Sequence, residues 1–203
     1  MSLDSTAYRL AERLFGQKLI QNQFRSLFVE ALIAPRLEIY GWHYTGDGWC
    51  GWDFQHGPQI SGCRLEVKQS AARQTWSKHN NRKTLPIFDI KARTGYFVEE
   101  GSKWIEEAGR PSHIYLFAWH PIHNVEIADH RDPAQWEFYL TPEYRLPQGQ
   151  KTISLSTIET LLKESALPAP ISFKEVAPAI EETRLSLGFQ QNFEVPANQA
   201  LDR

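Results

Sequence analysis

Apolar residues recur every three to four positions in the first part of the chain, which is the period of an amphipathic helix. Between residues 22 and 34 they fall at i, i+3, i+4, i+7 and i+8, so the pattern predicts a helix there, ended by Pro35. A shorter run with the same period predicts a helix over residues 4–15, stopped by Gly16. The chain therefore opens with two predicted helices.

After residue 41 the period shortens to two, which is typical of strands, and glycines punctuate the sequence. The strands predicted from this pattern are 42–44, 51–55, 62–69, 85–91, 95–98, 113–119 and 135–140. A helical turn is predicted over residues 104–108. Two capping boxes, at Ser156–Glu159 and Ser172–Glu175, predict helices near the end of the sequence.

The order of these elements predicts the fold class. Helices come first, an antiparallel meander follows, and further strands and helices complete the chain. This order indicates an α/β fold with a central mixed β-sheet flanked by helices. We expect one domain over residues 1–188 and a flexible tail over residues 189–203.

Composition excludes several classes of protein. The chain has 203 residues, of which 41% are hydrophobic, and no apolar run reaches the roughly 18 residues of a membrane helix. The first residues lack the pattern of a secretory signal, and two cysteines cannot form a disulfide scaffold. We therefore expect a soluble cytoplasmic protein with no membrane contact.

Positive charge is concentrated in one stretch, although the net charge of the chain is −2. Between Arg64 and Lys83 there are six basic residues and one acid. Such a stretch is either a solvated loop or a surface that approaches a nucleic-acid backbone. The second interpretation assigns DNA contacts to Arg73, Trp76, Lys78, Arg82 and Lys83, with Trp76 as a platform for base stacking.

The candidate chemistry lies just before and within this stretch. On a strand, Glu66 and Lys68 point to one face, and Asp53 lies on the preceding predicted strand, 13 positions earlier. Two neighbouring carboxylates repel each other unless a divalent cation lies between them. An oxygen-ligated site suits Mg²⁺ and phosphoryl chemistry, and the ammonium group of Lys68 can orient or deprotonate an attacking water.

The short motif acid-x-Lys is weak by itself, because about one occurrence is expected by chance. It occurs twice, at Glu66–Lys68 and at Asp89–Lys91. The first has Asp53 on the neighbouring strand and Glu30 on an upstream helix. The second fits an edge strand with an ordinary surface ion pair, so we favour the first as the site.

A predicted helix with Glu30, a strand with Asp53 and a following strand with Glu66-x-Lys68 resemble the core of the PD-(D/E)XK nuclease superfamily, whose members have the restriction-endonuclease-like fold. The resemblance covers residues 22–70, about a quarter of the chain. It implies a metal-dependent DNA nuclease, with an endonuclease preferred.

The resemblance also implies roles for individual residues. Asp53 and Glu66 would be metal ligands, with the carbonyl group of Val67 as a third, for Mg²⁺ or a substituting Mn²⁺. Lys68 would be the catalytic lysine and Glu30 a carboxylate that assists the metal site. The partner would be DNA, and double-strand cutting would favour a homodimer. The residue before Asp53 is tryptophan, where the family motif has proline.

Alternative interpretations stay open for the same residues. Asp53, Glu66 and Lys68 also fit a cross-strand ion pair on a surface ladder, and Glu30 a solvated helix position. A catalytically inactive nucleic-acid-binding or interaction module on the same fold is a further alternative. Separately, His120, His123 and His130 have a spacing compatible with a transition metal, although loop histidines are common without one. Residues 93–119 match no nuclease motif.

Overall fold

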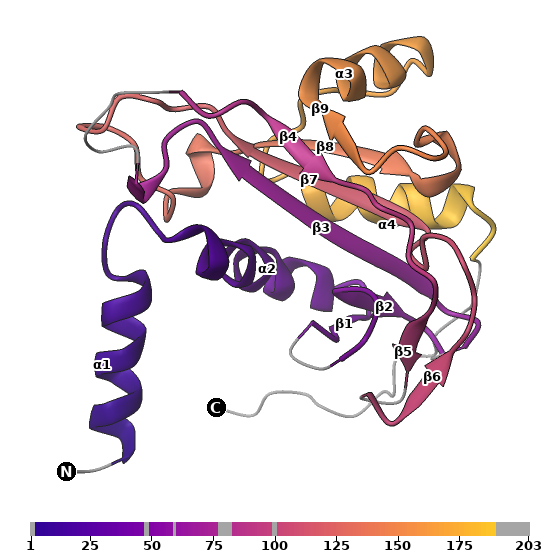
Figure 1. Ribbon diagram of the computed structural model, residues 1–203, viewed down its shortest axis with the longest axis horizontal. Helices are drawn as coiled ribbons and strands as arrows, with labels where there is room; N and C mark the ends of the chain where they lie inside the picture. Colours follow the sequence, from indigo (N-terminus) through magenta and orange to yellow (C-terminus); the bar gives the residue numbers. More distant parts are fainter. Residues whose placement is uncertain (1–2, 47–48, 59, 77–82, 99–100, 190–203) are drawn as a thin grey trace.

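A computed structural model describes residues 3–46, 49–58, 60–76, 83–98 and 101–189 (Figure 1). The helices in this part of the chain are α1 (Leu3–Phe15), α2 (Asn22–Glu38), α3 (Leu155–Glu164) and α4 (Val176–Ser186). The strands are β1 (Trp42–Tyr44), β2 (Phe54–His56), β3 (Cys63–Ala71), β4 (Ile87–Asp89), β5 (Tyr96–Val98), β6 (Lys103–Ile105), β7 (Ile114–His120), β8 (Glu137–Pro142) and β9 (Thr152–Ser154). Short 3₁₀ turns cover Pro133–Gln135 and Glu143–Arg145.

The main sheet has five strands in the order β1-β2-β3-β7-β8. The first three strands form the antiparallel meander that the sequence predicts, β7 lies parallel to β3, and β8 returns antiparallel to β7. Two smaller antiparallel pairs, β4 with β9 and β5 with β6, lie outside this sheet. The fold is therefore mixed α/β with a mixed sheet, as predicted.

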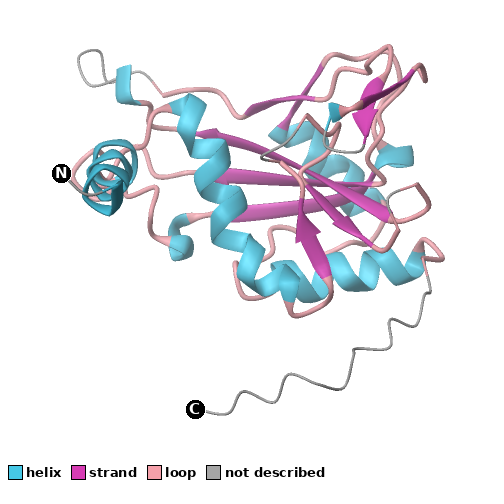
Figure 2. Ribbon diagram, turned by 90° about the horizontal axis from the view of Figure 1, so that it is seen from below, coloured by secondary structure: helices cyan, strands magenta, loops and turns pink. Residues whose placement is uncertain are grey.

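Both faces of the sheet are covered, and β7 shows how the sequence divides them. The alternate residues Ile114, Leu116 and Ala118 belong to a core shared with α2 and α4. Their neighbours Tyr115, Phe117 and Trp119 belong to a second core with β4, β9 and α3. Since successive strand residues point to opposite faces, one continuous apolar strand supplies both cores. Figure 2 shows the sheet between these covering elements.

Two local predictions are wrong. The helix over residues 22–34 does not end at Pro35 but continues to Glu38. Proline removes the hydrogen bond to the carbonyl group of Ala31, but both residues are exposed, so water can bind that carbonyl group. The helical turn predicted over residues 104–108 is not formed. Its first residues belong to strand β6, where Trp104 pairs with Phe97 on β5.

The predicted caps of the two C-terminal helices are found only in part. The side chain of Ser154 accepts a hydrogen bond from the backbone of Thr157, so the cap of α3 lies two residues before the predicted Ser156 and the helix begins at Leu155. Ahead of α4, the backbone N–H and the hydroxyl group of Ser172 both donate to the carboxylate of Glu175. This is only half of the predicted capping box, because Glu175 is itself the N-cap of α4 and no side chain caps that helix. Of the predicted tail only Phe189 is described, and residues 190–203 lie outside the described residues. None of the described helices combines the length and the apolar character that crossing a membrane requires.

Candidate active site

The register between β2 and β3 brings Asp53 to Glu66. Phe54 pairs with Leu65, so the next position along each strand places Asp53 opposite Glu66. Residues directly opposite each other in an antiparallel pair have their side chains on the same face. The two carboxyl groups therefore lie on one side of the sheet, and both line one cavity of about 570 Å³.

The difference in length between the strands leaves part of one edge of β3 free for Asp53. β2 pairs only with residues 63–65, whereas β3 continues to Ala71. Beyond the end of β2, the backbone N–H of Val67 donates to Oδ2 of Asp53 at 2.7 Å. In an extended strand the N–H and C=O groups of one residue point to the same edge, so the carbonyl group of Val67 faces the side of Asp53.

Glu66 and Lys68 lie two positions apart on β3 and form an ion pair between Oε1 and Nζ. The hydroxyl group of Ser112 donates to the other oxygen of Glu66 at 3.4 Å. The side chain of Lys68 is 21% exposed and that of Glu66 11% exposed, so solvent screens this pair only partly. The lysine lies at the site as the sequence predicts, in contact with one of the two carboxylates.

Glu30 reaches the same site from α2. It is buried, and its Oε2 accepts a hydrogen bond from the hydroxyl group of Tyr44 on β1 at 2.8 Å. Glu30 interacts electrostatically with Glu66 and Lys68, which links the helix to the strand carboxylates. The interpretation of Glu30 as a solvated helix residue is wrong, because its side chain is buried.

The pKa values of Asp53 and Glu30 are both raised. Burial raises the pKa of Asp53 well above its ordinary value, and the negative charges of Glu66 and Glu30 add to the shift. Burial also raises the pKa of Glu30; the hydrogen bond from Tyr44 opposes this shift and the charge of Glu66 reinforces it. A site that penalises its own negative charge in this way favours a positive ion among the carboxylates.

The pKa of Lys68 is also raised, but here neighbouring negative charges cause the shift and burial opposes it. Burial alone would lower its pKa, but the charge and hydrogen bond of Glu66, together with the charges of Asp53 and Asp89, outweigh burial and raise it. The side chain therefore stays protonated at neutral pH. This charge state suits the orientation of a water molecule or the neutralisation of a phosphate better than the removal of a proton.

The chemical type of the donor atoms fits a hard divalent cation, but their present arrangement does not surround one. The available donors are carboxylate and carbonyl oxygens, which Mg²⁺ prefers. In the part of the chain that the structure describes, no group of three or more His, Cys, Asp and Glu side chains is placed to hold a metal ion. Oδ2 of Asp53 and Oε1 of Glu66 are engaged by Val67 and Lys68. Metal binding would replace the contact between Glu66 and Lys68.

Two cations that were not predicted as site residues line the cavity with Asp53 and Glu66. They are Lys91 and Arg93, which follow β4 and are exposed. Neither side chain has a hydrogen bond or ion pair with any residue that the structure describes. The expected ion pair between Asp89 and Lys91 is absent, because only the backbone N–H of Lys91 contacts that carboxylate. The second acid-x-Lys motif was the available signal for this position.

The basic stretch after β3 is divided between the core and the surface. Arg73 is only 3% exposed, so the prediction that its side chain contacts DNA is wrong for this arrangement. Trp76 is 61% exposed and Lys83 is exposed, as a binding role would need. Lys78 and Arg82 lie outside the described residues.

Sequence reasoning gave no definite role to Arg25, which is buried beside the site. Its guanidinium group donates to Gln69 at 2.6 Å and to Gln74 at 2.9 Å, and burial lowers its pKa to about 10. Gln69 follows Lys68 on β3, so this contact fixes the free edge of β3 against α2. Arg25 thus ties β3 to α2, the helix that carries Glu30, and its sequence context gave no signal for this contact.

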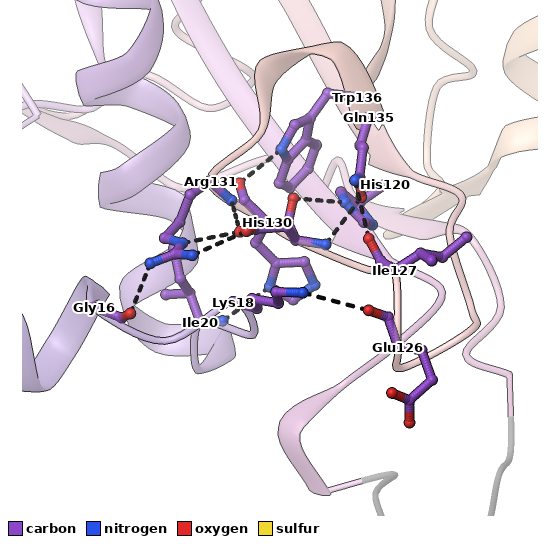
Figure 3. Close-up of polar contacts among 11 residues, drawn as sticks. Gly16, Lys18, Ile20, His120, Glu126, Ile127, His130, Arg131, Gln135 and Trp136 are labelled. Atoms are coloured by element: carbon purple, nitrogen blue, oxygen red, sulfur yellow. Dashed lines mark hydrogen bonds and ion pairs between the residues drawn. The ribbon is translucent and has the colours of Figure 1, made fainter.

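Of the three predicted histidines, His120 and His130 form a packing cluster with Trp136, whereas no ring contact joins His123 to it among the described residues (Figure 3). The rings of His120 and His130 lie edge to face at 4.8 Å, and Nδ1 of His130 accepts a hydrogen bond from the backbone of Ile20 at 3.0 Å. Burial lowers the pKa of both residues, that of His130 to about 3. The cluster joins the segment after α1 to the segment after β7, which is a structural role.

Comparisons of the chain with protein-family models, with curated proteins and with solved structures find no significant match.

Proposed function

We propose that the chain is a metal-dependent DNA nuclease with a restriction-endonuclease-like fold. The observation that carries the proposal is the meeting of Asp53, Glu66 and Glu30 with Lys68. These groups come from a helix and two strands in the order that the PD-(D/E)XK resemblance implies. Asp53 and Glu66 share a cavity with two exposed cations, Lys91 and Arg93.

Asp53, Glu66 and the carbonyl group of Val67 would hold the cation, with Glu30 in support. When bound, Mg²⁺ would supply Lewis acidity and lower the pKa of a bound water. The raised pKa values of Asp53 and Glu30 support this assignment, because a bound cation would offset the repulsion that the charge of Glu66 adds at both groups. Apart from stabilising the ion, these residues would fix its position relative to the sheet edge.

Lys68 would orient the attacking water and offset the charge that develops on the phosphate. In the hydrolysis, the water oxygen bonds to phosphorus while the bond from phosphorus to the leaving sugar oxygen breaks. The attacking water gives up a proton to solvent and the leaving oxygen takes one up, so the products are a phosphate monoester and a free sugar hydroxyl group. Lys91 and Arg93 would attract the phosphates on either side of the scissile bond.

Nicking of supercoiled plasmid tests the proposal. We expect nicking by the wild-type chain in Mg²⁺ or Mn²⁺ and none in EDTA. Lys68→Ala should reduce the rate by about 100-fold or more, in line with the loss of a group that acts on the proton or the charge in the transition state. Lys163→Ala, which removes an exposed lysine on α3, is the matched control. Equal rates for wild type and Lys68→Ala, both folded by circular dichroism, would contradict the assigned role.

The second candidate is a binding module that has lost catalysis on the same fold. The ion pair between Glu66 and Lys68 favours it, because it satisfies both groups without a metal. Salt-sensitive DNA binding with no cleavage in either cation would support this alternative. A chain that neither binds nor cleaves DNA would leave the carboxylates with a structural role.

A further inference from the structure

Three aromatic rings form a row along the cavity that Asp53 and Glu66 line. They are Trp49, which precedes β2, Phe97 on β5 and Trp104 on β6. The ring centres of Trp49 and Phe97 are 6.3 Å apart, and those of Phe97 and Trp104 are 4.9 Å apart. The β5–β6 pair lies at the end of the main sheet where β2 meets β3, which places this row beside the carboxylates (Figure 1).

The two outer rings are exposed although they are among the most apolar side chains of the molecule. Trp49 is 75% exposed and Trp104 48% exposed. Trp104 covers Gly95, where an added Cβ would overlap its ring. Gly101 packs against Trp49, where an added Cβ would lie 2.8 Å from the tryptophan Cβ. Close backbone approach therefore holds both side chains in place while their rings face solvent.

A buried layer supports this row. Trp52 is 1% exposed, and its ring meets that of Tyr96 at 5.6 Å between centres. The guanidinium group of Arg64 lies 4.1 Å from the centre of the Trp52 ring. Tyr96 and Phe97 are adjacent on β5, so one side of that strand packs inward while the other carries the exposed row. The exposed row therefore lies on a buried cluster of Trp52, Tyr96 and Val98.

We propose that Trp49, Phe97 and Trp104 stack on unpaired bases, so that the substrate of this site is a DNA strand with unpaired nucleotides beside the scissile phosphate. This inference rests on the proposed nuclease function. Aromatic rings bind the faces of bases, and in a duplex those faces are already stacked on their neighbours. Lys91 and Arg93 line the same cavity and supply the positive charge that the backbone needs. A single strand, a flap or a frayed end meets both requirements.

Fluorescence anisotropy with labelled oligonucleotides tests the stacking. The probes are an oligothymidylate of about 20 nucleotides, an abasic strand of the same length and a duplex of that length. Ca²⁺ replaces Mg²⁺, because it binds oxygen ligands with looser geometry and limits cleavage during the measurement. We expect the single strand to bind at least about tenfold more tightly than the abasic strand, which carries the same phosphates but no bases.

Substitutions locate the stacking surface. Trp49→Ala and Trp104→Ala should each weaken single-strand binding by about 5- to 100-fold and leave the affinity for the abasic strand unchanged. Trp104→Phe keeps a ring and should restore most of the affinity. Tyr8→Ala is the control, because it removes an aromatic ring that is 71% exposed on α1, away from the site. If Trp76→Ala alone weakens binding, the stacking surface is the basic stretch and our inference is wrong.

The outcomes separate this inference from the proposed function. Equal affinity for the single strand and the abasic strand, with metal-dependent nicking intact, would overturn the stacking alone. Absence of binding to every probe, together with absence of nicking, would overturn both proposals. Selective loss of single-strand binding in the two tryptophan variants would support the inference.

Discussion

The backbone N–H of Val67 on β3 donates a 2.7 Å hydrogen bond to Oδ2 of Asp53, 14 positions earlier in the chain. β2 has no ladder partner for this N–H, so a side chain takes the place of a backbone acceptor. The bond holds the aspartate at the edge of the sheet beside Glu66. It also partly offsets the unfavourable charge of a carboxylate that burial and two neighbouring glutamates disfavour.

Asp53→Asn is expected to stabilise the protein in the absence of divalent cations. The pKa of Asp53 is raised in the folded state, so the stability that it contributes is full below the pKa of the unfolded chain and is lost as pH rises through the folded value. At pH 8 the substitution should raise the free energy of unfolding by roughly 0.5–2 kcal/mol, while an amide oxygen can still accept from Val67. Urea unfolding at pH 5 and pH 8 measures this, with the exposed Glu182→Gln as control. A lower stability at pH 8 would contradict the prediction.

Divalent cations are expected to raise the melting temperature more strongly at higher pH. Protons compete with the cation for Asp53 and Glu30, whose pKa values are both raised. At a fixed Mg²⁺ or Mn²⁺ concentration, the rise should grow as pH increases above the ordinary carboxyl range, because the cation binds only the folded state. Thermal shift assays from pH 5 to pH 8 measure it. Asp53→Asn should abolish most of the rise, and the same rise in both chains would exclude Asp53 as a ligand.

Tyr44→Phe is expected to destabilise the protein more at high pH than at low pH. The hydroxyl group of Tyr44 donates to Glu30 and holds its pKa below the value that burial alone would give. Its removal should cost about 1 kcal/mol at pH 8 and less at pH 5, because the charged fraction of Glu30 grows with pH. Urea unfolding of both chains at the two pH values provides the measurement. A cost that does not depend on pH would mean that the hydroxyl group acts only through packing.

Lys91→Ala and Arg93→Ala are expected to weaken DNA binding and to reduce its salt dependence. Each removes one exposed cation from the cavity, so the slope of log K against log salt should fall by about 1 for each. Titrations at several salt concentrations provide the slopes, with Lys163→Ala as control. Lys83→Ala tests the basic stretch in the same assay. If the salt slope changes only in Lys83→Ala, DNA contacts the basic stretch and not the cavity.

Much of the local structure follows directly from the sequence. The alternation over residues 62–69 predicts a strand with Glu66 and Lys68 on one face, and the helical period after residue 22 predicts the helix that carries Glu30. Both patterns depend on interactions between near neighbours. Two predictions failed where packing decided the outcome: Trp104 packs on Phe97 and makes a strand of a predicted turn, and burial removes Arg73 from the surface.

The sequence by itself determined the strand positions of Glu66 and Lys68 and the helix position of Glu30, because periodicity is a property of the chain. Asp53, predicted within a strand, lies just before β2, and the register of β2 with β3 brings it to Glu66. Only the tertiary structure decided that Lys91, Arg93 and two exposed tryptophans line the same cavity as Asp53 and Glu66. These residues come from segments outside the main sheet that pack against the end of β3. Packing between such segments depends on the shapes of both surfaces, and these shapes cannot be read from the spacing of residues along the sequence.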